Sequence, residues 1–162
     1  MDGFSPYYQD CIFDRLRKHV NPVGGRLYIV GLEPIPHSAT GDGNIICQMT
    51  KLRDACILLA NHRCYREYPL DWILRNLTRA GFRTVDYATF PILYSHQTIV
   101  RQLNVARSKL PLFPSPGLAN EMRTRIDELE RESYEKTSKA ANNRIKLGFD
   151  YVVVAELIEH DS

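Results

Sequence analysis

The sequence lacks long hydrophobic runs. Its apolar stretches, such as residues 57–60 and 151–155, are far shorter than the roughly 18 residues of a membrane-spanning helix. Met1 is followed by Asp2 rather than by a basic and apolar leader. We therefore expect no membrane insertion and no export. With 44% hydrophobic and 25% charged residues in a chain of 162, the composition predicts one folded domain in the cytoplasm.

Paired cysteines and an excess of one charge are also missing. The four cysteines are irregularly spaced with no C-x-x-C motif, which favours a reducing compartment over a disulfide framework. The 21 Lys and Arg residues stand against 19 Asp and Glu residues, and the two signs are interleaved. A net charge of +2 in this arrangement does not indicate a nucleic-acid partner.

Short motifs with a known catalytic mechanism are absent from the sequence. It contains no G-x-G-x-x-G, no P-loop, no G-x-S-x-G and no H-E-x-x-H. The glycines of residues 41–44 have no adjacent strand before them and no helix at the right distance after them, so we do not expect a phosphate cradle there. No catalytic residue can be assigned from motifs.

The hydrophobic pattern that is present predicts an α/β fold with three strands and several helices. Residues 26–32 are nearly continuously apolar, which predicts a strand buried on both faces in a parallel sheet covered by helices. Residues 82–87 alternate apolar and polar, which predicts a half-exposed strand near a sheet edge, and residues 149–158 form the last strand. Apolar residues at helical spacing predict helices over 6–19, 50–61, 69–80, 97–110 and 118–145.

The remaining segments are expected to be loops. Residues 37–49 have little periodicity and predict a long loop, and residues 111–117 are rich in proline and predict a turn between two helices rather than a domain linker. The helix over 118–145 is mostly charged with a thin apolar stripe, so we expect it at the surface.

The carboxyl end of the strand over 26–32 is the first candidate site, because ligands of open α/β sheets bind beyond such strand ends. Glu33 and His37 are its titratable groups. Glu33 could orient a ligand hydroxyl or amine or act as a base, although a carboxylate at a strand end more often caps a helix or faces solvent. Asp2, Gly3 and Phe4 lie before a helix N-terminus that could hold a polar ligand, or simply form a tight turn.

Two further clusters carry chemistry-bearing side chains. Arg63 and Tyr65 belong to a polar and aromatic segment, residues 63–68, that could bind a carboxylate or phosphate or form surface ion pairs. Cys56, His62 and Cys64 lack the paired spacing and the fourth ligand of a zinc site. We expect no metal there and expect Cys56 to pack in a core.

Several stretches resemble the later part of class I S-adenosylmethionine-dependent methyltransferases. Residues 2–6, DGFSP, are similar to the loop after that family's fourth strand, and NPVGGRLYIVG at 21–31 resembles the entry into its fifth strand. LTRAGFRTVDY at 77–87 resembles the last crossover helix and the next strand. GFDYVVVAEL at 148–157 would be the final antiparallel strand, which in that family lies between the other two.

The resemblance implies a partial Rossmann-like methyltransferase fold and the cofactor S-adenosylmethionine. Asp2, Gly3 and Phe4 would border the cofactor, and Glu33, His37, Arg63 and Tyr65 are the candidate substrate-binding residues. The family's glycine-rich turn, ribose-binding acid and third strand would all precede Met1. We therefore expect the chain alone to bind the cofactor weakly or not at all, and to be weakly active or inactive.

The implied fold makes a definite topology prediction. The strand over 26–32 should pair with residues 149–158, and these should pair antiparallel with residues 82–87. The outer edge of the first strand would then be exposed and apolar, so we expect a complementing chain or a second copy to cover it. The alternative function is a non-catalytic protein-interaction module derived from a methyltransferase fold. The methyl acceptor cannot be inferred.

Overall fold

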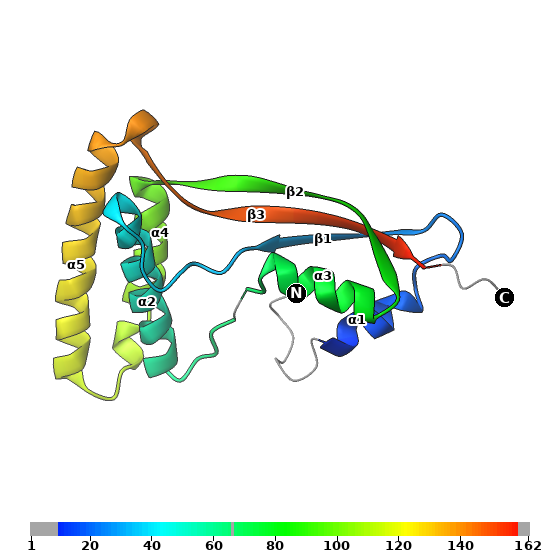
Figure 1. Cartoon of the computed structure of the whole chain (residues 1–162). Coiled ribbons are helices and arrows are strands. Elements are labelled where there is room, and N and C mark those ends of the chain that lie inside the picture. Colours follow the sequence, from blue (N-terminus) through cyan, green and yellow to red (C-terminus); the bar gives the residue numbers. More distant parts are fainter. Residues whose placement is uncertain (1–9, 66, 159–162) are drawn as a thin grey trace. The chain divides into compact units, whose positions relative to one another are not determined.

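A computed structural model of the chain describes residues 10–65 and 67–158. In chain order the elements are α1 (Asp10–Arg17), β1 (Arg26–Leu32), the 3-10 turn η1 (Gly41–Gly43), α2 (Asn44–Leu59), α3 (Leu70–Arg79), β2 (Phe82–Ser95), α4 (His96–Arg107), η2 (Leu110–Leu112), α5 (Pro116–Lys139), η3 (Ala141–Asn143) and β3 (Arg144–Leu157) (Figure 1). The predicted α/β class, with three strands and several helices, is confirmed. None of the helices in the described ranges is long and apolar enough to cross a membrane.

The chain forms two compact units. Within the described residues, the first unit holds residues 10–34, 65–91 and 148–158, and the second holds residues 35–64 and 92–147. Each unit has its own cluster of buried apolar side chains. The chain passes between the units four times, at 34–35, 64–65, 91–92 and 147–148. The expectation of one domain stays a prediction, because neither unit is a continuous stretch of sequence.

The three strands form one sheet in the order β1-β3-β2. β3 pairs antiparallel with β1, in a register that places Arg26 opposite Glu156 and Leu32 opposite Asp150. On the other side of β3, the N–H of Ile158 donates to the carbonyl of Gly81 over 3.0 Å, and β2 runs in the opposite direction to β3 (Figure 1). The predicted topology, with the last strand between the other two, is therefore confirmed.

Helices cover one face of this sheet in the first unit. α1 and α3 lie on the same side of the strands (Figure 1), and their buried side chains Phe13, Ile73 and Leu77 form one core with Ile29 of β1 and Val153 of β3. Side chains alternate between the two faces of a strand, so the neighbours of these strand residues point to the other face.

The prediction that β1 is buried on both faces of a parallel sheet is wrong for the described residues. Tyr28 and Val30 are 62% and 69% exposed, and the neighbour of β1 is the antiparallel strand β3. The apolar run of β1 shows that both faces are hydrophobic. It does not show whether this chain supplies the cover for each face.

The helical unit packs α2, α4 and α5 around a separate core. Its centre includes Ile46 and Met49 of α2, Leu103 of α4, and Ile126 and Leu129 of α5, all 2% exposed or less. The predicted thin apolar stripe on the last helix is thus confirmed, and charged residues occupy much of the rest of that helix.

Several element boundaries differ from the predictions. α2 begins at Asn44 rather than at residue 50, because Ile45, Ile46 and Met49 are buried in the core and form its first turns. The glycines of residues 41–44 led to the prediction of a loop there. α5 ends at Lys139 rather than at 145, since the next residue, Ala140, has an extended backbone with φ −79° and ψ 153°. Asn142 and Asn143 follow in the left-handed conformation, with φ 53° for each. β2 and β3 are each 14 residues long and extend into the helical unit.

Gly31 permits the central contact between β1 and β3. A Cβ at this position would lie 2.3 Å from atoms of the buried Tyr151 ring, which is far inside van der Waals contact. We predict that Gly31→Ala lowers the free energy of unfolding by about 1–3 kcal/mol, because the ring or the strand must shift. Urea denaturation of both proteins measures the change.

Gly117, in the first turn of α5, provides a matched control for this substitution. Its position is open, since a Cβ there would approach Ser115 Oγ no closer than 3.8 Å. Gly117→Ala should leave stability unchanged or raise it by up to about 1 kcal/mol, because alanine favours a helix. Equal stability of Gly31→Ala and the wild type would contradict the tight contact.

Candidate functional site

The loop after β1 places Glu33 against the beginning of α3. The N–H of Leu70, the first residue of α3, donates to Glu33 Oε2 over 2.9 Å, and the N–H of Glu33 donates to the carbonyl of Phe149 over 2.9 Å. A carboxylate at this place satisfies an otherwise unpaired amide of the first turn and interacts favourably with the helix dipole. The structure therefore gives Glu33 the capping role that the sequence left open as its simpler explanation.

The same corner of the first unit is fixed by the buried Tyr151 and the half-buried Tyr68 and Trp72. The hydroxyl of Tyr151, on β3, donates to the carbonyl of Tyr68 over 2.7 Å, and the Tyr68 ring lies 4.3 Å from the Trp72 ring between centroids. These contacts hold the segment before α3 against the carboxyl end of β1. Glu33 is half-buried, and its carboxylate has lone pairs beyond the one that accepts from the Leu70 amide.

The four candidate substrate-binding residues fall on both units. Glu33 and Tyr65 belong to the first unit, where Tyr65 is 59% exposed, and His37 and Arg63 belong to the second, where both are exposed. Neither unit therefore gathers all four. Asp2, Gly3 and Phe4, the candidate cofactor-binding residues, lie outside the described residues. The binding roles of all seven stay predictions.

Among the described residues, the cysteines do not belong to a group that could bind a metal ion. Cys56 is fully buried in the core of the helical unit, which confirms its predicted packing role. The Cys64 thiol donates to the carbonyl of Asp54 over 3.4 Å. Across residues 10–65 and 67–158, no three His, Cys, Asp or Glu side chains are grouped so that they could hold a metal ion.

The helical unit has a surface hollow of about 460 Å³ that the sequence did not reveal. It lies along α4 and α5 and is lined by His96, Asp127, Glu130, Arg131 and Tyr134. Four of these residues lie on α5, at three, four and seven residues from the first of them. Residues at these spacings share one helix face, so their grouping could have been predicted from the sequence. The contribution of α4 could not be anticipated, because it depends on helix packing.

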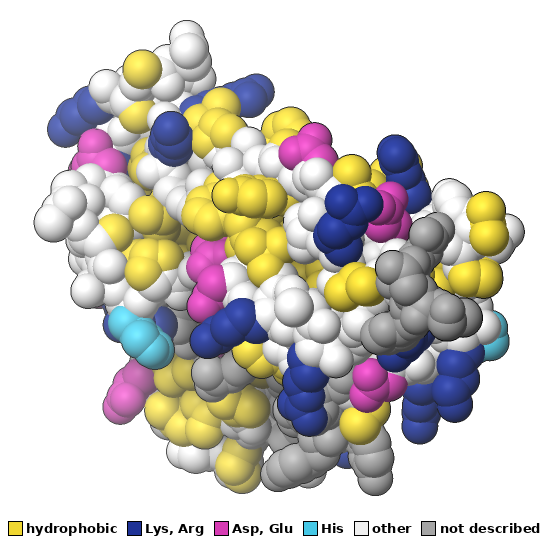
Figure 2. Space-filling model, turned by 45° about the vertical axis from the view of Figure 1, so that its right-hand side comes forward, with side chains coloured by type: hydrophobic (Ala, Val, Ile, Leu, Met, Phe, Trp, Pro, Cys, Tyr) yellow, Lys and Arg dark blue, Asp and Glu magenta, His cyan; other side chains and the backbone are white. Residues whose placement is uncertain are grey.

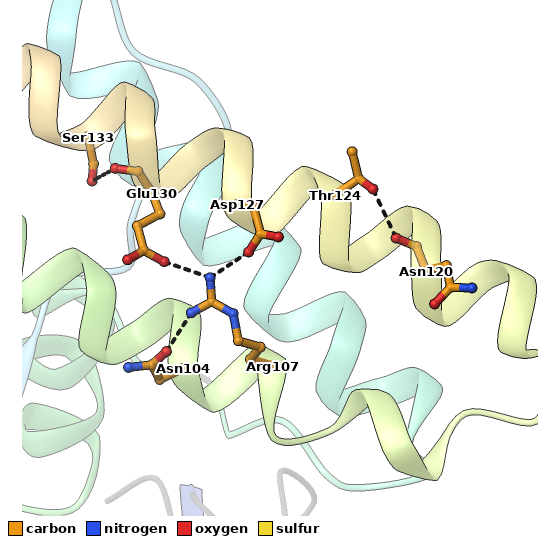
Figure 3. A network of polar contacts seen from close by, with 7 residues as sticks. All are labelled: Asn104, Arg107, Asn120, Thr124, Asp127, Glu130 and Ser133. Atoms are coloured by element: carbon orange, nitrogen blue, oxygen red, sulfur yellow. Dashed lines mark hydrogen bonds and ion pairs between the residues drawn. The ribbon is translucent and has the colours of Figure 1, made fainter.

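Arg107 of α4 binds the two acidic residues that line this hollow (Figure 3). Its Nη2 contacts Asp127 Oδ1 at 2.7 Å and Glu130 Oε2 at 2.6 Å, and its Nη1 donates to Asn104 Oδ1 over 2.6 Å. The hydrogen bonds to Asp127 and then Glu130 raise the pKa of Arg107, so it remains charged. The two carboxylates are thus used to join α4 to α5.

His96 lies at the edge of the hollow and contacts a serine of α5. His96 Nδ1 lies 2.8 Å from Ser133 Oγ, which itself lies 2.7 Å from the carbonyl oxygen of Glu130. Ser133 itself is fully buried and cannot reach a substrate, so this pair is not a nucleophile and base of the hydrolase type.

Comparison with known proteins does not assign the chain to a family. No protein-family model matches the sequence, and no curated protein matches it. Among solved structures, the chain is similar to a protein of Bacillus halodurans C-125 described as a "putative methyltransferase", with 13% identity and a TM-score of 0.46. The match covers 91% of this chain but 57% of that protein, so the chain spans little more than half of its length.

Glu33 offers a direct test of the capping role. We predict that Glu33→Ala lowers the free energy of unfolding by about 1 kcal/mol, because the Leu70 amide loses its acceptor. Glu33→Gln should lose less, since its amide oxygen can still accept this hydrogen bond. Urea denaturation compares the three proteins, and an Ala variant as stable as the wild type would contradict a structural role.

The thiols should differ strongly in reactivity. Burial raises the pKa of Cys56, and it also raises that of Cys47, where nearby Lys51 opposes the shift in part. A raised pKa leaves less thiolate at pH 8, and burial blocks access as well, so both should react with iodoacetamide at least about tenfold more slowly than the exposed Cys11. Mass spectrometry after timed labelling measures the rates.

The control for this experiment is the same protein in guanidinium chloride, where all four cysteines should react at similar rates. If native Cys56 reacted as fast as Cys11, the helical core would have to open readily, contrary to the packing described above.

Proposed function

We propose that this chain forms the C-terminal part of a class I S-adenosylmethionine-dependent methyltransferase domain and takes part in methyl transfer only when a complementing polypeptide completes that domain. The observation that carries the proposal is the position of β3, antiparallel and between β1 and β2. The resemblance of residues 148–157 to the family's final strand implied this order from the sequence.

The placement of the helices supports the same proposal. α1 precedes β1 and α3 lies between β1 and β2 along the chain, and both pack on one face of the sheet. The other face exposes Tyr28 and Val30, and β1 is an edge strand of the described sheet. A sheet with one bare apolar face and one bare edge is what an incomplete domain would present.

The chemistry asked of the protein is mainly alignment. S-adenosylmethionine supplies an electrophilic methyl group, and holding an acceptor in line with it accounts for much of the rate of such a transfer. Asp2, Gly3 and Phe4 are proposed to border the cofactor. Glu33 is proposed to act by fixing the start of α3 beside the acceptor, together with Tyr65, while His37 and Arg63 are the proposed contributors from the helical unit.

A non-catalytic interaction module is the second candidate. The exposed apolar face of the sheet favours it, because this surface has an obvious use in binding whether or not methyl transfer occurs. The two candidates differ in one requirement, since only the first needs the assembled protein to bind S-adenosylmethionine.

The first test uses the 162-residue chain alone. We expect no measurable binding of S-adenosylmethionine by isothermal titration calorimetry, because the chain contains no segment that resembles the family's glycine-rich turn or ribose-binding acid. Binding with a micromolar dissociation constant would contradict the proposed incompleteness and would place a cofactor site within this chain.

The second test uses the chain purified together with its bound partner from cells that produce it. Incubation with tritiated S-adenosylmethionine and ultraviolet light should label the assembly, and unlabelled S-adenosylhomocysteine should compete. An assembly that neither binds nor transfers the methyl group would overturn the methyltransferase proposal and leave the interaction module.

A further inference from the structure

In the part of the chain that the structure describes, one face of the first unit's sheet is apolar and exposed, here named the open sheet face. Large hydrophobic side chains reach the molecular surface in several places (Figure 2). On the sheet they come from all three strands and comprise the exposed Tyr28, Val30, Val85 and Tyr87 and the half-buried Val152 and Val154. Because residues paired directly across antiparallel strands share a face, the pairs Tyr28–Val154 and Val30–Val152 place β1 and β3 side chains together.

β2 contributes to the same face. Arg83 of β2 forms an ion pair with Glu156 of β3, which puts Arg83 on the side of Glu156 and Arg26. Val85 and Tyr87 follow Arg83 at intervals of two residues and are 43% and 53% exposed. The open sheet face is therefore continuous across three strands.

The size of this face limits what can cover it. Seven residues at about 3.3 Å and three strands at about 4.8 Å give an area about 23 Å long and about 14 Å wide. One α-helix with its side chains is about 10–12 Å across, and about 15 helical residues have this length. A second copy stacked face to face would contact about 300 Å², well below the roughly 800 Å² per partner of a stable interface.

A covering element therefore needs a further contact, and the outer edge of β1 adjoins the face. β1 is an edge strand of the described sheet, so its outward amides and carbonyls can pair with an added strand. A segment made of a strand followed by a helix can use this edge and the open sheet face together. Stacking of two identical sheets cannot use both.

The charges at the two ends of the face select the direction of the helix. Arg26 and Arg83 flank Glu156 at one end, which leaves a net charge of +1, and exposed Asp150 lies at the other end. The C-terminal end of a helix dipole is favoured near the arginines, and the N-terminal end near Asp150. The helix would run opposite to β1, and a strand that precedes it by a short connection would run parallel to β1.

We propose that the open sheet face and the outer edge of β1 bind a strand-helix segment of a partner polypeptide. The strand adds parallel to β1. The helix is amphipathic, about four turns long, and lies with its apolar side on Tyr28, Val30, Val152 and Val154 and its C-terminal end toward Arg26 and Arg83.

Photocrosslinking in cells that produce the protein tests this proposal. Tyr28 is replaced by p-benzoylphenylalanine, and the crosslinked peptide is identified by mass spectrometry. We expect a peptide of another polypeptide with apolar residues at positions i, i+3 or i+4, and i+7. A crosslink to a second copy of this chain, to a peptide without this spacing, or to no protein at all would overturn the proposal.

A pair of matched variants locates the contact. Val30→Asp places a charge on the open sheet face and should lower the crosslink yield at least about tenfold, because the charge would be buried without a partner. Val23→Asp makes the same change at a 78% exposed turn of the same unit and should leave the yield unchanged. Equal loss in both variants would contradict the assignment to this face.

Two controls separate the possible failures. Circular dichroism should give both variants the wild-type melting temperature within a few degrees, because each side chain is exposed in the chain alone. The crosslink does not depend on methyl transfer. A partner with the expected helix and no binding of S-adenosylmethionine would retain this inference and overturn the proposed function.

Discussion

The insertion of β3 between β1 and β2 is the constraint on which the sheet unit depends. β1 and β2 are separated by η1, α2 and α3 in the sequence, and the last strand joins them only after α4 and α5 have followed. Its central place requires close packing against β1, where the absence of a side chain at Gly31 makes room for the Tyr151 ring. Tyr151 then reaches the backbone before α3 and connects the strands to the helix that covers them.

The strand order could be predicted because local patterns and the resemblance agreed. Residues 26–32, 82–87 and 149–158 each indicated a strand, and the resemblance supplied their order. Strand lengths and helix ends could not be predicted in the same way. β2 continues over residues 88–95 and β3 begins at Arg144, so both strands are longer than the segments that the sequence patterns indicated. Strand length depends on pairing with neighbouring strands as well as on local sequence.

The candidate site shows the same division. The sequence indicated that Glu33 follows a strand end and that it could cap a helix. It did not indicate the amide that Glu33 binds, because Leu70 lies 37 residues away and its position depends on how α3 packs. The hollow beside His96 was not predicted, because its residues come from two helices whose contact is made through Arg107. Sequence periodicity predicts which residues share one face of a helix. It does not predict which helix faces pack against each other.

The exposed apolar face of the sheet explains why the sequence of β1 predicts burial on both faces whereas the structure shows burial on one. A strand covered on both faces by its own chain and a strand covered on one face by a partner show the same hydrophobic pattern. In both cases, consecutive positions are hydrophobic. Tyr28 and Val30 alternate with the buried Ile29 and are far more exposed. Keeping such residues on a bare face carries a risk of aggregation, which a chain can avoid when a partner occupies that face for most of its lifetime. In the proposed assembly, the hydrophobic run of β1 would supply half of an interface.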